Sequence, residues 1–268
     1  MLPFSDSHCH LDYYRPELLA QDPRAQLVSG DSPSACWARA RRAGVGRVIA
    51  LTIGAANFAA VAELEGLAGV FPAYGLHPLY QAEHQPAHLN LLEKYLGRPA
   101  TVALGECGLD GNGPEPAAQR RCFTAQIGLG RELALPLLIH SRGALEEVLQ
   151  LLRRERAGAF VIHSFTGSDV QLRKILELGG LIGVGGTCSY PRAQRLRRQL
   201  ATLPADRYLL ETDGPDQPLC GRQGAVNYPE LIPIIAAELA AIRGEALAEI
   251  SRASEANFQR FFFPTPGI

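Results

Sequence analysis

The sequence predicts an α/β protein, a (β/α)8 TIM barrel that forms a single domain over residues 1–268 and carries an added C-terminal helix. Short runs of Val, Ile and Leu alternate eight times with longer segments of helical periodicity, which is typical of βα units and a parallel sheet. The length of 268 residues also suits a barrel, since such folds commonly use about 250 residues as one domain. A doubly wound open sheet is the alternative, but no G-x-G-x-x-G turn follows the first strand.

The individual elements follow from these two patterns. Strands of a parallel barrel are covered on both faces and therefore read as short apolar runs, whereas helices repeat apolar residues every three or four positions. The strands are predicted at 2–6, 47–52, 70–76, 101–105, 136–139, 159–162, 181–184 and 207–211. The helices between them are predicted at 35–43, 55–67, 89–96, 117–133, 144–156, 169–178 and 193–203, and two more at 228–242 and 244–262.

A polar stretch over 13–34 contains Pro16, Pro23, Gly30 and Pro33 and is predicted to be a long loop after the first strand. In a barrel, such a loop lies over the mouth of the active site. A disordered surface insertion is the alternative.

Composition excludes several classes of protein. The chain is 47% hydrophobic and 20% charged, with a formal net charge of -1, as in an ordinary soluble globular protein and unlike a globally basic nucleic-acid binder. The apolar stretch 231–242 is shorter than about 20 residues and contains Pro233 and Glu238, so no membrane span is expected. No secretory signal opens the chain, and its six scattered cysteines are expected to be reduced. These features favour a cytoplasmic enzyme.

Two histidines, His8 and His10, follow the first predicted strand. Residues i and i+2 of an extended chain share a face, so both imidazoles can reach one metal ion. Alone, this H-x-H pattern is weak evidence, because histidine is also a frequent buried polar residue.

Further candidate ligands stand at the ends of four other predicted strands. They are Glu106 after the fourth, His140 after the fifth, His163 after the sixth and Asp213 after the eighth. The C-terminal ends of all strands of a parallel barrel gather on one face, so these residues and the two histidines can converge. Histidines with carboxylates, and no cysteine among them, favour Zn, Mn, Co or Ni, with Mg also a candidate. Six ligands exceed one tetrahedral site, which predicts two divalent metal ions about 3.5 to 4 Å apart.

Seven motifs in this order resemble the TatD family of metal-dependent hydrolases, within the amidohydrolase-like barrels, over essentially the whole chain. They are SDSHCHLD, GLHP, GECGLD, LLIHSR, VIHSFTG, IGVGGT and ETDGP. The resemblance implies that His8, His10 and Asp213 bind one ion, that His140 and His163 bind the other, and that Glu106 bridges them. It also implies that His77, in GLHP, contacts substrate rather than metal.

The chain departs from the family pattern in places. Asp110 is followed by GNGPEP instead of an aromatic or basic run, which puts substrate contacts there in doubt. The first loop is longer than usual, and the segment 214–224 is similar to a subgroup whose substrate is poorly defined.

The expected function is a divalent-metal-dependent hydrolase, a deoxyribonuclease that cleaves phosphodiester bonds with a metal-activated water. Asp213 is expected to accept the proton of that water and Arg142 to steady a phosphate, although an exposed arginine near a helix start is the alternative for Arg142. The partner is DNA or another phosphoester, bound transiently, and a monomer is favoured. An amide or ester hydrolase, including one for aminoacyl esters, is the alternative function for the same two-metal cage.

Overall fold

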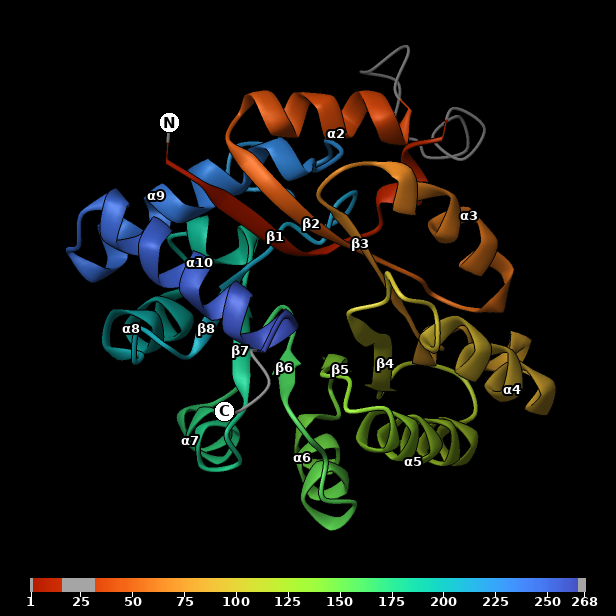
Figure 1. Ribbon diagram of the computed structural model, residues 1–268. Helices are drawn as coiled ribbons and strands as arrows, with labels where there is room; N and C mark the ends of the chain where they lie inside the picture. Colours follow the sequence, from red (N-terminus) through yellow and green to blue (C-terminus); the bar gives the residue numbers. More distant parts are fainter. Residues whose placement is uncertain (1, 16–31, 265–268) are drawn as a thin grey trace.

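A computed structural model describes residues 2–15 and 32–264. Eight parallel strands form one sheet in the order β1 to β8, each paired with the next (Figure 1). They are β1 (Phe4–Cys9), β2 (Val45–Leu51), β3 (Val70–Tyr74), β4 (Ala103–Asp110), β5 (Leu137–Arg142), β6 (Phe160–Ile162), β7 (Leu181–Val184) and β8 (Tyr208–Leu210). The ring closes between β1 and the segment after β8, where Asp213 N donates to His8 O and His10 N to Gly214 O, both at 2.8 Å. The predicted (β/α)8 barrel is confirmed.

Helices lie outside the ring of strands (Figure 1). They are α2 (Pro33–Arg42), α3 (Phe58–Ala62), α4 (Pro86–Leu96), α5 (Pro116–Glu132), α6 (Leu145–Arg154), α7 (Asp169–Glu177), α8 (Gln194–Thr202), α9 (Ile232–Arg243) and α10 (Leu247–Phe262). Within the described residues, six short 3-10 segments accompany them: η1 (Leu11–Tyr14), η3 (Ala55–Asn57), η4 (Glu63–Gly66), η5 (Pro78–Glu83), η6 (Gly186–Ser189) and η7 (Pro229–Leu231).

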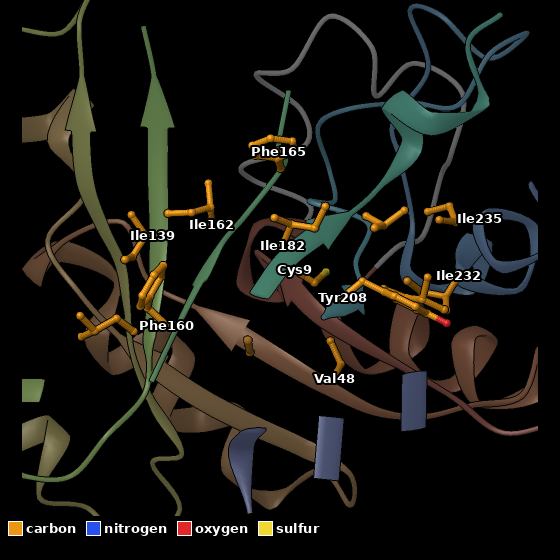
Figure 2. Close-up of a cluster of buried hydrophobic side chains, with 14 of the residues drawn as sticks. Cys9, Val48, Ile139, Phe160, Ile162, Phe165, Ile182, Tyr208, Ile232 and Ile235 are labelled. Carbon is orange, nitrogen blue, oxygen red and sulfur yellow. The ribbon is translucent and has the colours of Figure 1, made fainter. Parts of the chain in front are cut away.

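The apolar residues form two layers, as the alternation of side chains along a barrel strand requires. On β2, Ile49 and Leu51 belong to the cluster inside the barrel, whereas Val48 and Ala50 belong to the layer between strands and helices. Figure 2 shows part of this outer layer, where Tyr208 of β8 lies beside Ile232 and Ile235 of α9. Both layers are almost fully buried.

Helix α10 covers the end of the barrel at which the strands begin. Its Asn257 donates to the carbonyls of Ala205 and Tyr208, both at 2.8 Å, and its Ser251 donates to Pro3 O at 2.7 Å. Three of its side chains join the inner apolar cluster: Phe258, Phe261 and Phe262. The added helix therefore seals the face opposite the predicted site.

Several predicted boundaries are wrong. β1, β4 and β5 extend further toward the C-terminus than expected, so that His8, Glu106 and His140 lie within strands rather than after them. The predicted helix 55–67 is broken into η3, α3 and η4. The side chain of Asn57 accounts for the first break, since it accepts from Ile53 N and Gly54 N and donates to Asp12.

Most of the predicted 13–34 loop, residues 16–31, lies outside the described residues; the described parts of it are the end of η1 and the start of α2. Over the described residues, the search for a helix able to cross a bilayer finds none. All six cysteines are free thiols, as predicted.

We expect Phe258→Ala to lower the free energy of unfolding by about 3 to 5 kcal/mol, because the ring is buried in the inner cluster and its loss leaves a cavity. Urea denaturation measures the change. Arg252→Ala, on the exposed face of the same helix, is the matched control and should shift stability by no more than about 0.5 kcal/mol. Equal losses in the two variants would contradict the sealing role of α10.

Candidate metal centre

The strands that carry His8 and Glu106 are irregular at these residues. The pairing of β1 with β2 shifts register between Asp6 and Cys9, and the pairing of β4 with β5 shifts between Leu104 and Cys107. Irregularities of this kind change the direction in which a side chain points. They account locally for the position of both side chains in the mouth of the barrel.

Glu106 lies at the centre of a cage of histidines. Its Oε2 is 3.3 Å from Nε2 of both His8 and His10. Its Oε1 faces three other ring nitrogens, His77 Nε2 at 3.2 Å, His140 Nδ1 at 3.1 Å and His163 Nε2 at 3.1 Å. One carboxylate therefore presents its two oxygens to two different sets of histidines.

Asp213 completes the side of the cage that faces Oε2. Its Oδ1 lies 3.4 Å from His8 Nε2 and 3.7 Å from His10 Nε2. Its backbone has φ 57°, in the left-handed region that non-glycine residues adopt mainly at functional sites. Gln217 Nε2 donates to Oδ2 at 2.5 Å, so the second oxygen is also held.

Asp6 fixes β1 against the segment that carries Asp213. Its Oδ1 accepts from His8 N and Thr212 N at 3.1 and 3.0 Å, and its Oδ2 accepts from Thr212 Oγ1 at 2.5 Å. This buried carboxylate was not among the predicted site residues, because its partner lies about 200 positions away in the chain.

The cage fits divalent cations. His8 is fully buried, and neither of its ring nitrogens has a hydrogen-bond partner. Buried polar atoms are seldom left without partners, and a metal ion would satisfy the ring nitrogen that faces the cage, His8 Nε2. His8 belongs to two groups of possible metal ligands, one with His10 and Asp213 and the other with Glu106 and His163. Within each group, the ligand atoms lie within 4.8 Å of one another.

The charges of the cage require compensation. Burial disfavours the ionised form of Glu106. The pKa of Glu106 is nevertheless held well below its usual value by the surrounding histidines, His77, His163 and His8. Burial lowers the pKa of His8 to about 3, which keeps it neutral, the form that binds metal. Burial acts to lower the pKa of His10, but the hydrogen bond with Glu106 and the negative charges of Glu106, Asp213 and Asp12 together raise it to about 9. The cage thus draws positive charge, which protons or metal ions can supply.

His77 differs from the other histidines in the role of its nitrogens. Its Nδ1 accepts a hydrogen bond from Leu79 N at 3.1 Å, so its proton is on Nε2 when the ring is neutral. Burial lowers the pKa of His77, which favours that neutral form. His77 Nε2 also lies with Glu106 and His140 in a third possible metal group, but a protonated nitrogen donates and does not ligate. His77 Nε2, which carries the proton, lies 3.2 Å from Glu106 Oε1, and His77 also lines the cavity, so this donor faces both the cage and the pocket.

Two further carboxylates lie behind the histidines and were missed in the sequence. Asp110 Oδ2 is 2.9 Å from His140 Nε2, which leaves His140 Nδ1 directed at the cage. Glu211 Oε1 accepts from Ser164 N at 2.5 Å and lies 3.7 Å from His163 Nδ1. Carboxylates in such positions orient metal-binding histidines and raise their basicity. Both belong to motifs already singled out, GECGLD and ETDGP, but nothing in the sequence pairs either carboxylate with a particular histidine.

A cavity of about 780 Å³ opens over the cage. His10, His77, Glu106, His140, His163 and Asp213 all line it, as does the exposed Arg142. Arg142 is the last residue of β5 and lies two residues before Ala144, the N-cap of α6, so its exposed position is also that of the alternative. The structure brings all eight predicted site residues to this cavity or to its floor, where His8 is buried.

Gly183 makes room for Glu211. A Cβ at this position would lie 2.1 Å from Glu211 Oε2 and 2.4 Å from Oε1. We expect Gly183→Ala to displace Glu211, to lower stability by about 1 to 3 kcal/mol and to weaken metal uptake. Thermal unfolding and metal analysis measure the two effects. Gly128→Ala, with no neighbouring atom within 4 Å, is the matched control, and an equally tolerated Gly183→Ala would disprove the packing argument.

Comparisons of the sequence and the structure with known proteins identify the family of this chain. The chain matches the family described as TatD related DNase over residues 5–263. The uncharacterized metal-dependent hydrolase YjjV of Escherichia coli (strain K12) is 39% identical over 93% of this chain and 94% of its own. The 3'-5' ssDNA/RNA exonuclease TatD of Klebsiella pneumoniae (strain 342) is 35% identical over 72% of this chain and 77% of its own. The crystal structure of the Escherichia coli YjjV protein has a TM-score of 0.86 at 36% identity and covers 97% of each chain. The chain belongs to the TatD family of metal-dependent hydrolases, as its motifs predict.

Proposed function

We propose that residues 1–268 act as one TatD-like hydrolase domain that uses two divalent ions to cleave phosphodiester bonds in DNA or another nucleic acid. The observation that carries the proposal is the position of Glu106, whose two oxygens face two separate sets of histidines. Nuclease activity in a relative named as an ssDNA/RNA exonuclease supports the substrate class.

In this proposal, Glu106 would help to hold both ions. His8, His10 and Asp213 would hold the ion on the Oε2 side, and His140 and His163 the ion on the Oε1 side. The mixture of imidazole and carboxylate ligands suits Zn, Mn, Co or Ni, and Mg is the further candidate. When bound, such a pair lowers the pKa of a water molecule and neutralises charge on phosphate oxygens.

The remaining chemistry belongs to side chains of the pocket. Asp213, which lines the cavity as part of the cage, would accept the proton of that water. We assign the proton to Oδ2, because Oδ1 is turned toward His8 and His10. His77 donates from Nε2 to a phosphate oxygen, and Arg142 binds a non-bridging oxygen at the rim of the cavity.

We expect Glu106→Ala and Asp213→Ala each to reduce the release of nucleotides from single-stranded DNA by more than about 100-fold, because each removes a ligand on which several kcal/mol of transition-state stabilisation depends. The measurement is nuclease activity of the metal-loaded protein, with metal content determined in parallel. Glu132→Ala, which removes an exposed carboxylate of α5, is the control.

Activity that survives both substitutions would overturn the assignment. A far larger kcat/KM on lactones, cyclic amides or aminoacyl esters than on nucleic acid would instead establish the carbonyl hydrolase alternative. That panel uses the same metal-loaded protein, so the two functions are compared at equal metal content.

We further expect a weak dependence on salt. Arg142 is the one lysine or arginine among the described residues that line the cavity, so few phosphates are neutralised by side chains. With one or two such contacts, raising salt from about 50 to 200 mM should weaken binding of single-stranded DNA by less than about tenfold. Binding isotherms at several salt concentrations measure the slope. A loss of about 1000-fold would require an extended basic surface and would contradict this account.

A further inference from the structure

The cavity over the metal centre is chemically divided according to the strands that supply its walls. The loops after β1, β2 and β3 contribute an apolar wall of Tyr13, Ile53, Leu79 and Tyr80. The ends of β5 and β6 and the segment after β8 contribute a polar wall of Ser141, Arg142, Ser164, Thr166, Asp216 and Gln217. Glu106 of β4 lies between the two walls.

The apolar wall begins directly beside the cage. The rings of His77 and Tyr80 meet edge to face with centroids 5.8 Å apart. Tyr13 lies in η1, three residues after His10. Burial, followed by the proximity of Tyr13, raises the pKa of Tyr80, which places the two rings within electrostatic reach of each other.

These side chains are not absorbed by the core. Leu79 is 41% exposed, and Tyr13, Ile53 and Tyr80 are each partly exposed. Apolar side chains that face an otherwise polar cavity favour an apolar part of a ligand. Because they line the same cavity as the cage, this part of the ligand lies near the group that reacts there.

We propose that Tyr13 and Tyr80, supported by Ile53 and Leu79, form a stacking surface for the base of the nucleotide next to the scissile phosphate. The inference rests on the proposed function and deepens it. The two parts of a nucleotide match the two walls. The base has flat apolar faces that suit the apolar wall, and the phosphate needs cations and hydrogen-bond donors, which the polar wall and the metal centre provide. Tyrosine rings stack on any base, so this surface binds nucleotides without selecting a sequence.

The stacking surface has a consequence for substrate choice. A base in a duplex already stacks on its neighbours and pairs with its partner, and turning it aside costs a few kcal/mol. A single strand or a frayed end offers its base without that cost. The proposal therefore favours unpaired ends over paired DNA.

The test combines a tyrosine variant with an abasic substrate. Single-stranded oligonucleotides carry either an ordinary nucleotide or an abasic one on the 5′ or the 3′ side of the terminal phosphodiester. We expect Tyr80→Ala to lower kcat/KM on the ordinary strand by about 5- to 150-fold, the range for loss of one stacked base, and to leave kcat/KM on one of the abasic strands unchanged within twofold. Tyr13→Ala should behave in the same way, and Tyr80→Phe should restore most of the loss because it keeps the ring.

The controls distinguish failure of the stacking surface from failure of the proposed nuclease activity. Leu133→Ala removes an exposed apolar side chain just before β5, at the opposite end of the barrel, and should change neither substrate. Equal losses on ordinary and abasic strands, or no loss on either, would overturn the stacking surface while leaving the nuclease intact. Failure of the metal-loaded wild-type protein to cleave any strand would overturn the nuclease itself.

Discussion

The buried charge of Glu106 is the constraint on which the site depends. A carboxylate that is 2% exposed at the centre of a barrel is costly unless positive charge or donors surround it, and here five histidines do so. The other carboxylates are arranged around that requirement. Asp213 faces the cage, and Asp110 and Glu211 lie behind the histidines of the cage. Asp6 fixes β1 to the segment that carries Asp213.

The barrel separates this polar centre from the parts that stabilise the fold. The cage and its cavity occupy the end at which the strands finish, while α10 seals the end at which they begin. Loops at the end where the strands finish can therefore vary in chemistry without loss of the inner apolar cluster. One such variation is the contrast between the apolar wall from the loops after β1, β2 and β3 and the polar wall from β5, β6 and the segment after β8.

Much of this architecture could be predicted from the sequence because the barrel has simple periodicities. Eight apolar runs indicated eight strands, and the shared polarity of parallel strands brought six distant residues to one face. Strand ends were less predictable, since His8, Glu106 and His140 are polar and yet lie inside strands. Supporting contacts such as Glu211 with Ser164 depend on side-chain positions that no periodicity encodes.

The position of α10 has a consequence for the order in which the protein is made. Its phenylalanines complete an apolar cluster to which β2 through β8 all contribute, yet they follow all eight strands in the chain. A nascent chain synthesised up to β8 exposes Ile49, Leu138 and Leu209 at the open base of its barrel. The inner core is thus complete only after α10 has been synthesised, and until then its exposed apolar side chains favour aggregation or chaperone binding.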